Sequence, residues 1–216
     1  MISKILLLKP LALAALIVTA GASQAAVTVY TTQASFLAAV TAPGVDTYTG
    51  FSISNPTPSP INRTAGAYGY TATAETSSFF GAGTTANPWL STNIAADDVT
   101  FSNFTGGVGA IGGLFFGSDI SGLFAAGEIS LEATDSFGAT STYTVTAATV
   151  NSFVGFVSTG AISSLVVSAV QGASPLWPTI DNLTLAQAAP IPEPGTYGLL
   201  LAGLGVVGFV ARRRRG

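Results

Sequence analysis

Residues 195–211 form an apolar run without a charged side chain. In lipid, such a run can satisfy its backbone N–H and C=O groups only as a helix, because no water is present to pair with them. Pro192 and Pro194 flank Glu193 just before the run and prevent regular structure from continuing into it. Four arginines follow the run: Arg212, Arg213, Arg214 and Arg215. We therefore predict a transmembrane helix over residues 195–211 and, by the positive-inside rule, a basic cytoplasmic end over residues 212–216.

The order of Pro192-Glu193-Pro194, apolar run and arginines resembles the PEP-CTERM tail, a sorting signal. This resemblance covers only the last residues of the sequence, from 190 onward. It implies that the protein is an exosortase substrate, held in the inner membrane with its body in the periplasm until exosortase cuts near the Pro-Glu-Pro motif. The body would then reach the cell surface or the extracellular polysaccharide matrix. The same tail is also catalogued as an ice-binding protein C-terminal domain, a label that implies no activity.

The residues of the tail leave a second explanation open, which is a permanent single-span anchor. The run is short for that role, since it is close to the lower limit of about 17 residues for a membrane span. It is also rich in glycine.

Residues 1–25 have the pattern of a secretory signal peptide. Lys4 and Lys9 supply the positive charges, residues 11–18 form a short apolar segment, and small residues follow. Cleavage after Ala22 or after Ala25 fits this pattern. We therefore expect an exported protein with a body over residues 26–186, long enough for one domain with its own core. Residues 187–194 are expected to be a linker that contains the Pro-Glu-Pro motif.

The body has an acidic composition, with one basic and nine acidic residues between positions 26 and 190 and therefore a net charge of −8. Such a surface repels phosphate backbones, so we expect no nucleic-acid partner. The sequence contains no cysteine, hence no disulfide, and no histidine. Histidine is the usual general base and the commonest ligand of zinc, copper and iron. We therefore expect a protein that is not an enzyme.

Most of the body has the pattern of short β-strands. The clearest case is residues 128–147, where Ile129, Leu131 and Ala133 alternate with polar residues, a turn follows over residues 135–138, and a second alternating segment returns. Other strands are expected over residues 27–30, 47–53, 67–73, 98–103, 110–116, 153–157, 164–170 and 179–185.

One short helix is expected over residues 32–40, capped by Thr31 or Thr32 and ending before Pro43. Eight to eleven strands with almost no other helix predict an all-β fold, a β-sandwich of jelly-roll type. The body also resembles the domain commonly found before PEP-CTERM tails, in the helix around Phe36 and in residues 153–156 and 180–183. That second resemblance implies no activity.

Four aromatic residues are candidates for binding a carbohydrate, which is the alternative function. Trp89 and Trp177 lie next to prolines, and we expect both in loops, where an aromatic ring can serve as a platform for a sugar. The interpretation that we prefer is that the two tryptophans close the ends of the sandwich. Tyr68 and Tyr70 share one face of an expected strand and fit either role.

Calcium is the one cofactor that the sequence leaves open, because oxygen ligands suffice for it. The candidate ligands are Asp97, Asp98, Asp119 and Asp181, all near the ends of expected strands. No calcium-loop motif accompanies them, and ordinary turn carboxylates explain them better. A glycosidase would need two carboxylates on either side of one bond, up to ~9.5 Å apart. Glu128 and Glu132 share a strand face but are separated by ~13 Å, so they do not form such a pair.

Overall fold

The computed structural model describes residues 26–190 and, within the tail, residues 200–201, 203–205, 207 and 211–214. The body is a compact unit, Ala25–Ile191, and the tail belongs to a second unit. The expected signal peptide and Pro192-Glu193-Pro194 lie outside the described residues. Of the described tail residues, 200–201, 203–205, 207 and 211–213 are helical. Within the parts of the chain that the structure describes, no helix is both long and apolar enough to cross a membrane.

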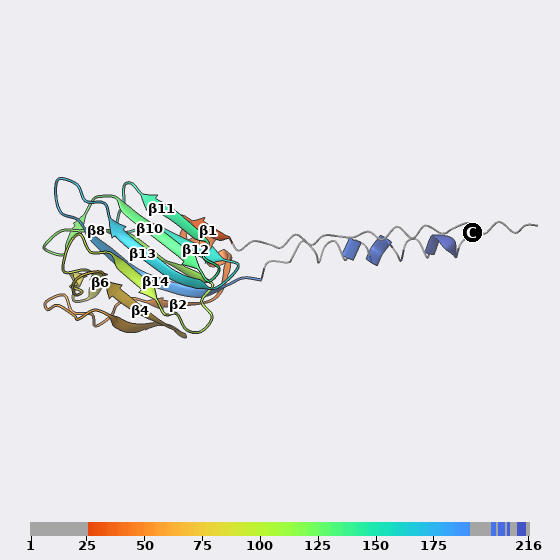
Figure 1. Cartoon of the computed structure of the whole chain (residues 1–216), viewed down its shortest axis with the longest axis horizontal. Coiled ribbons are helices and arrows are strands. Elements are labelled where there is room, and N and C mark those ends of the chain that lie inside the picture. The colour runs from red at the N-terminus through yellow and green to blue at the C-terminus, as the bar shows by residue number, and fades with distance from the viewer. Residues whose placement is uncertain (1–25, 191–199, 202, 206, 208–210, 215–216) are drawn as a thin grey trace, which may run out of the picture. The chain divides into compact units, whose positions relative to one another are not determined.

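The body is all-β apart from one short helix, as the sequence predicts (Figure 1). The larger sheet contains β1 (Val27–Tyr30), β2 (Val40–Asp46), β5 (Ala82–Thr84), β6 (Asn87–Ser91), β8 (Ala110–Ser118), β9 (Phe124–Ala125), β12 (Phe153–Ser158) and β14 (Trp177–Ala188). Its strand order is β1-β12-β8-β14-β6-β5, with β2 also paired to β14 and β9 to β8. All these pairings are antiparallel.

The smaller sheet is also antiparallel and has six strands. It contains β3 (Ile61–Ala65), β4 (Tyr68–Ala74), β7 (Val99–Ser102), β10 (Ile129–Asp135), β11 (Thr140–Val145) and β13 (Ile162–Ala169). Its order is β11-β10-β13-β7-β4-β3. The two sheets give a β-sandwich-like body, while the jelly-roll connectivity stays a prediction. The described residues contain fourteen strands, more than the eight to eleven expected, because several short strands lack an alternating pattern.

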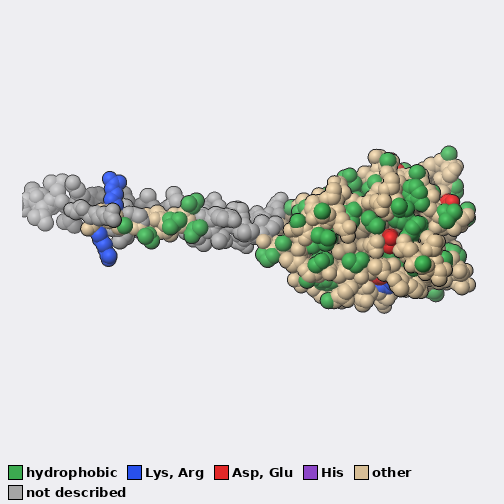
Figure 2. Space-filling view, turned by 180° about the vertical axis from the view of Figure 1, so that it is seen from behind, with side chains coloured by type: hydrophobic (Ala, Val, Ile, Leu, Met, Phe, Trp, Pro, Cys, Tyr) green, Lys and Arg blue, Asp and Glu red, His purple; other side chains and the backbone are tan. Residues whose placement is uncertain are grey.

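The surface of the body carries few charged side chains, and Figure 2 shows one such largely uncharged face. Charged residues make up 8% of the whole sequence. The polar surface is therefore built mainly from hydroxyl and amide groups.

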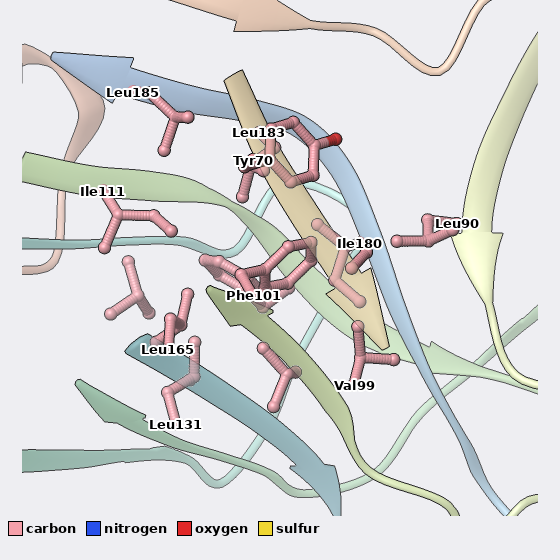
Figure 3. Close-up of a cluster of buried hydrophobic side chains, with 14 of the residues drawn as sticks. Tyr70, Leu90, Val99, Phe101, Ile111, Leu131, Leu165, Ile180, Leu183 and Leu185 are labelled. Atoms are coloured by element: carbon pink, nitrogen blue, oxygen red, sulfur yellow. The ribbon is translucent and has the colours of Figure 1, made fainter. Parts of the chain in front are cut away.

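The hydrophobic core lies between the two sheets, where side chains from both meet (Figure 3). Ile180, Leu183 and Leu185 of β14 point inward toward Phe101 of β7 and Leu165 of β13, and all five are fully buried. The expected hairpin is confirmed, since β10 and β11 are antiparallel neighbours. In β10, alternate residues are buried and their neighbours face solvent or are half-buried, as the sequence pattern requires.

The helix α1 (Gln33–Ala38) lies against the outer face of the larger sheet. Thr32 caps it, accepting a hydrogen bond from the backbone N–H of Ser35 at 3.2 Å. Phe36 is fully buried and packs against Phe153 of β12 with 5.4 Å between ring centroids. Gly155 makes room for this ring, because a Cβ there would lie 2.3 Å from Phe36 Cδ2. The expected helix is confirmed with a shorter extent.

The strand expected over residues 47–53 is absent, and β2 lies just before it instead. The chain turns after β2, because Asp46 Oδ1 accepts a hydrogen bond from the backbone N–H of Tyr48 at 2.8 Å and Tyr48 has a φ of +54°. Pro43, expected to precede a break, lies within β2 where the register against β14 shifts. A register shift can accommodate proline, which has no N–H to donate to the ladder.

Candidate functional site

The outer face of the larger sheet carries both tryptophans of the chain. Trp177 is the first residue of β14 and pairs with Ser118 of β8. Trp89 lies in β6, two residues before Ser91, which pairs with Thr179 of β14. Since alternate residues of a strand share a face, these side chains all point away from the core that the intervening residues fill. The expectation that both tryptophans lie in loops is wrong, because the strands extend further than the neighbouring prolines suggest.

The two half-buried tryptophans have different surroundings on this face. The ring of Trp89 lies edge-to-face on the fully buried ring of Phe116, with centroids 4.8 Å apart and an interplanar angle of 87°. Trp89 therefore packs against the main hydrophobic cluster, to which Phe116 belongs, and has a packing role. Trp177 instead lines an open hollow on the surface.

This hollow has a volume of about 210 Å³ and a mixed lining of apolar and polar groups. Its polar side chains include Asn93, Ser118 and Asp119, and its apolar ones include Trp177 and Ile120. We call it the Trp177 hollow. It is smaller than the ~300–1,000 Å³ of enclosed small-molecule pockets. An aromatic ring beside amide and carboxylate groups can contact both the C–H face and the hydroxyls of a sugar.

The carboxylate of Asp119 is fixed by its own loop. Its Oδ1 accepts hydrogen bonds from the backbone N–H of Ser121 at 2.8 Å and of Leu123 at 3.0 Å. Gly122 allows this tight loop with a φ of +73°. Oδ2 of Asp119 accepts no hydrogen bond from the residues that the structure describes. The loop thus fixes the carboxylate of a residue that lines the hollow without needing a cation.

The four calcium candidates are not brought together. In the described parts of the chain, no group of three or more acidic side chains is placed to hold a metal ion. Asp97 is buried and accepts hydrogen bonds from two neighbouring hydroxyls, and Asp98 is half-buried beside it. Asp119 lines the Trp177 hollow, and Asp181 lies in the middle of β14.

Asp181 is a buried carboxyl group on the outer face, with an exposed fraction of 5%. Continuing the register of β14 and β6 by one residue places it opposite Trp89. Burial raises the pKa of Asp181, and hydrogen bonds from Asn182 and Asn87 only partly oppose that rise. Its Oδ1 has no hydrogen-bond partner among the described residues. The carboxyl group of Asp181 is thus a buried polar group next to Trp89 on this face.

Tyr68 and Tyr70 do not offer a platform to a sugar, because each is only 3% exposed. Their hydroxyls donate within the body, from Tyr68 to the carbonyl oxygen of Ala42 at 2.8 Å and from Tyr70 to Asp46 Oδ2 at 2.7 Å. The prediction that the two tyrosines share one strand face is confirmed, and this face points into the core.

A buried ion pair joins the two sheets near these tyrosines. Arg63 of β3 donates from Nε to Asp46 Oδ2 at 2.7 Å and from Nη2 to Asp46 Oδ1 at 2.8 Å. The guanidinium also lies over the ring of Tyr48, 5.2 Å from its centroid. Burial alone would raise the pKa of Asp46, but hydrogen bonds from Arg63, Tyr70 and the Tyr48 amide lower it overall. The two charged groups of this cluster pair with each other, so we assign the cluster a structural role.

Threonines of two strands, β11 and β7, lie in one row on the outer face of the smaller sheet. Thr142 of β11 pairs with Glu132 of β10, which pairs with Val166 of β13, which pairs with Thr100 of β7. Glu132 and Val166 interrupt the row. We therefore assign these threonines to strand formation on an exposed face.

Comparison with known proteins identifies the tail. The family model of the PEP-CTERM protein-sorting motif matches residues 190–215, which include Pro192, Glu193, Pro194 and the four arginines. The match confirms the resemblance seen in the sequence and implies exosortase-dependent sorting of an exported, surface-directed protein. No curated protein and no solved structure matches the chain.

Proposed function

We propose that this protein is an exported cargo that exosortase releases to the cell surface or the extracellular polysaccharide matrix, where its β-sandwich-like body has a structural or interaction role without catalysis. The observation that carries this proposal is the PEP-CTERM protein-sorting motif over residues 190–215, directly after a compact all-β body. The apolar run would hold the precursor in the inner membrane, with the arginines on the cytoplasmic side. The membrane anchor is therefore temporary in this proposal.

The composition of the body supports a role without catalysis. It has no histidine or cysteine, and the buried ion pair of Asp46 and Arg63 is engaged in hydrogen bonds that stabilise the fold. Incubating the purified protein with panels of polysaccharides should release no reducing sugar. Measurable turnover would contradict this part of the proposal.

Sorting is tested by deleting the exosortase gene and fractionating the cells. We expect the body in the extracellular fraction of the parent strain and the full-length chain in the membrane fraction of the deletion strain. Replacing Pro192, Glu193 and Pro194 by alanine in the parent strain should reproduce the membrane retention. Replacing Gly172, an exposed loop residue of the body with open space around it, provides a matched control that should still be released. Unchanged release from the deletion strain would refute exosortase-dependent sorting.

A second candidate function is carbohydrate binding by the body. The observation that favours it is the Trp177 hollow, where an aromatic ring lies beside an amide and a carboxylate group. We propose this role without calcium, because Asp119 belongs to no group of three or more acidic side chains that could hold a metal ion in the described structure. Chelation with EDTA should leave any such binding unchanged.

A further inference from the structure

We infer that the Trp177 hollow is the binding site for an uncharged, hydroxyl-rich polymer, a neutral polysaccharide, and that it rejects acidic polysaccharides. This inference rests on the carbohydrate-binding role proposed above and adds to it the location of the site and the charge of the ligand.

The first argument is the order of the strands. β14 lies between β8 and β6, so Trp177, which begins β14, lies between the end of β8 and the end of β6. Asp119 directly follows β8, and Asn93 follows β6. The central aromatic ring thus has a carboxylate acceptor on one side and an amide, both donor and acceptor, on the other. A sugar lying on the ring would present its hydroxyls to both sides.

The second argument is that the site is held rigid before a ligand arrives. The side chain of Gln171 holds the backbone of Leu176, the residue before Trp177. Its Nε2 donates to the carbonyl oxygen of Leu176 at 2.7 Å, and its Oε1 accepts from the Leu176 N–H at 3.1 Å. The backbone N–H of Asn93 donates to the carbonyl oxygen of Ser78 at 2.9 Å. A site that is already ordered loses little conformational entropy when it binds.

The third argument concerns charge. Arg63 is the single basic residue between positions 26 and 190; its guanidinium donates two hydrogen bonds to Asp46, and it does not line the hollow. No lysine or arginine of the described body is therefore available at the hollow to pair with a uronate or sulfate group. Asp119 and the net charge of −8 instead repel anions. An uncharged polymer avoids this cost.

The fourth argument is access. Trp177 pairs with Ser118 at one end of β8, whereas Ala186 pairs with Ala110 at its other end, ~26 Å away along the strand. Residue 190, where the body leads into the tail, follows the Ala186 end of β14. The last described residue of the body, residue 190, therefore follows the end of β14 that is remote from the hollow. The exposed neighbour Ile120, 81% exposed, extends the apolar surface beside the ring.

Affinity electrophoresis of the full chain in a mild detergent tests the inference. Native gels containing hydroxyethylcellulose or a soluble β-1,3-glucan serve as neutral probes, and gels containing alginate serve as the acidic probe. We expect at least one neutral polymer to retard the protein and alginate not to. Trp177→Ala should weaken the retardation by about tenfold or more, as removal of a central aromatic contact does at binding sites. Phe137→Ala is the matched control, because Phe137 is 75% exposed in a turn outside the hollow and its loss should change nothing.

Fluorescence adds a readout that does not depend on the stability of an alanine variant. The chain has two tryptophans, so Trp89→Phe leaves Trp177 as the sole reporter and Trp177→Phe leaves Trp89. The neutral polymer should shift or quench the emission of Trp177 more than that of Trp89. A response of Trp89 alone would overturn the location of the site.

The outcomes separate this inference from the proposals on which it rests. Retardation by neutral polymers that persists in Trp177→Ala would overturn the site while leaving a carbohydrate-binding role. Retardation by alginate alone would overturn the ligand class. Retardation by none of the polymers would overturn both the inference and the carbohydrate-binding role. The sorting proposal would be untouched in every case, since fractionation tests it independently.

Discussion

Replacing Arg63 by methionine should cost the body a large part of its stability. The substitution keeps an unbranched chain over the rings of Tyr48 and Phe51 but removes both hydrogen bonds to Asp46. Asp46 is only 6% exposed, so its carboxylate would be left buried without its cationic partner. The hydroxyl of Tyr70 and the amide of Tyr48 would remain as its donors.

The expected magnitude follows from burial. Removing one partner of a fully buried ion pair costs ~3–5 kcal/mol. The side chain of Arg63 is 22% exposed, which places the loss at the lower end, about 3 kcal/mol in the free energy of unfolding. For a body of this size, a loss of about 3 kcal/mol corresponds to a decrease in the melting temperature of roughly 6–12 °C.

Urea denaturation at pH 7, followed by circular dichroism, measures this loss. Asn151→Asp is the matched control, because it makes the same change in net charge at an exposed position and should alter stability by less than about 0.5 kcal/mol. The pKa of Asp46 is lowered in the folded state, so its contribution is present above the ordinary carboxyl pKa and is lost as the pH falls through the folded-state value. The difference between the parent protein and Arg63→Met should therefore shrink below about pH 4. A loss under about 1 kcal/mol at pH 7, or a difference independent of pH, would refute this reasoning.

Two further substitutions test the packing of the helix α1 and the hydrogen bonds of the hairpin turn. Gly155→Ala should destabilise the body by about 1–3 kcal/mol, because the new Cβ would lie 2.3 Å from a ring atom of Phe36, whereas Gly172→Ala has open space and should be neutral in thermal unfolding. Equal melting temperatures for both variants would contradict the role given to the helix α1. Asp135→Ala should cost about 1–3 kcal/mol at pH 7, since Oδ1 accepts two backbone N–H groups of the hairpin turn and Oδ2 accepts the hydroxyl of Ser158. Burial alone would raise the pKa of Asp135, but these hydrogen bonds lower it overall, so the loss should be seen above about pH 4 in urea titrations and fade on acidification.

The regular part of the fold could be predicted because its periodicity is local. In β4 and β10, alternate residues are buried, and the continuous apolar run of β8 has both faces covered. The alternation of apolar and polar residues determines which face of a strand is buried, so these strands could be predicted without knowing their partners.

The missed strands depend on pairing that the local sequence does not show. β2 contains Pro43 and Gly44, two residues typical of turns, and is kept in the sheet by pairing with β14. β5 and β9 are only three and two residues long and exist through their neighbours β6 and β8. Short segments of this kind carry too few residues for a pattern.

The candidate site illustrates a different limit. From the sequence, Trp177 is a candidate sugar platform and Asp119 is a candidate calcium ligand, and these two roles are unrelated. The register of β14 against β8 places them at one hollow, and the end of β6 adds Asn93, which no sequence signal had marked. The sequence could suggest single candidate residues, but which of them lie together depends on the order of the strands.

The central claim is that the tail is a sorting signal that is removed on release. Intact-mass spectrometry of the chain recovered from the extracellular fraction tests it most directly. We predict the mass of a chain that ends near Pro192–Pro194 and lacks the residues that follow. A released chain that still carries residues 195–215 would contradict the account.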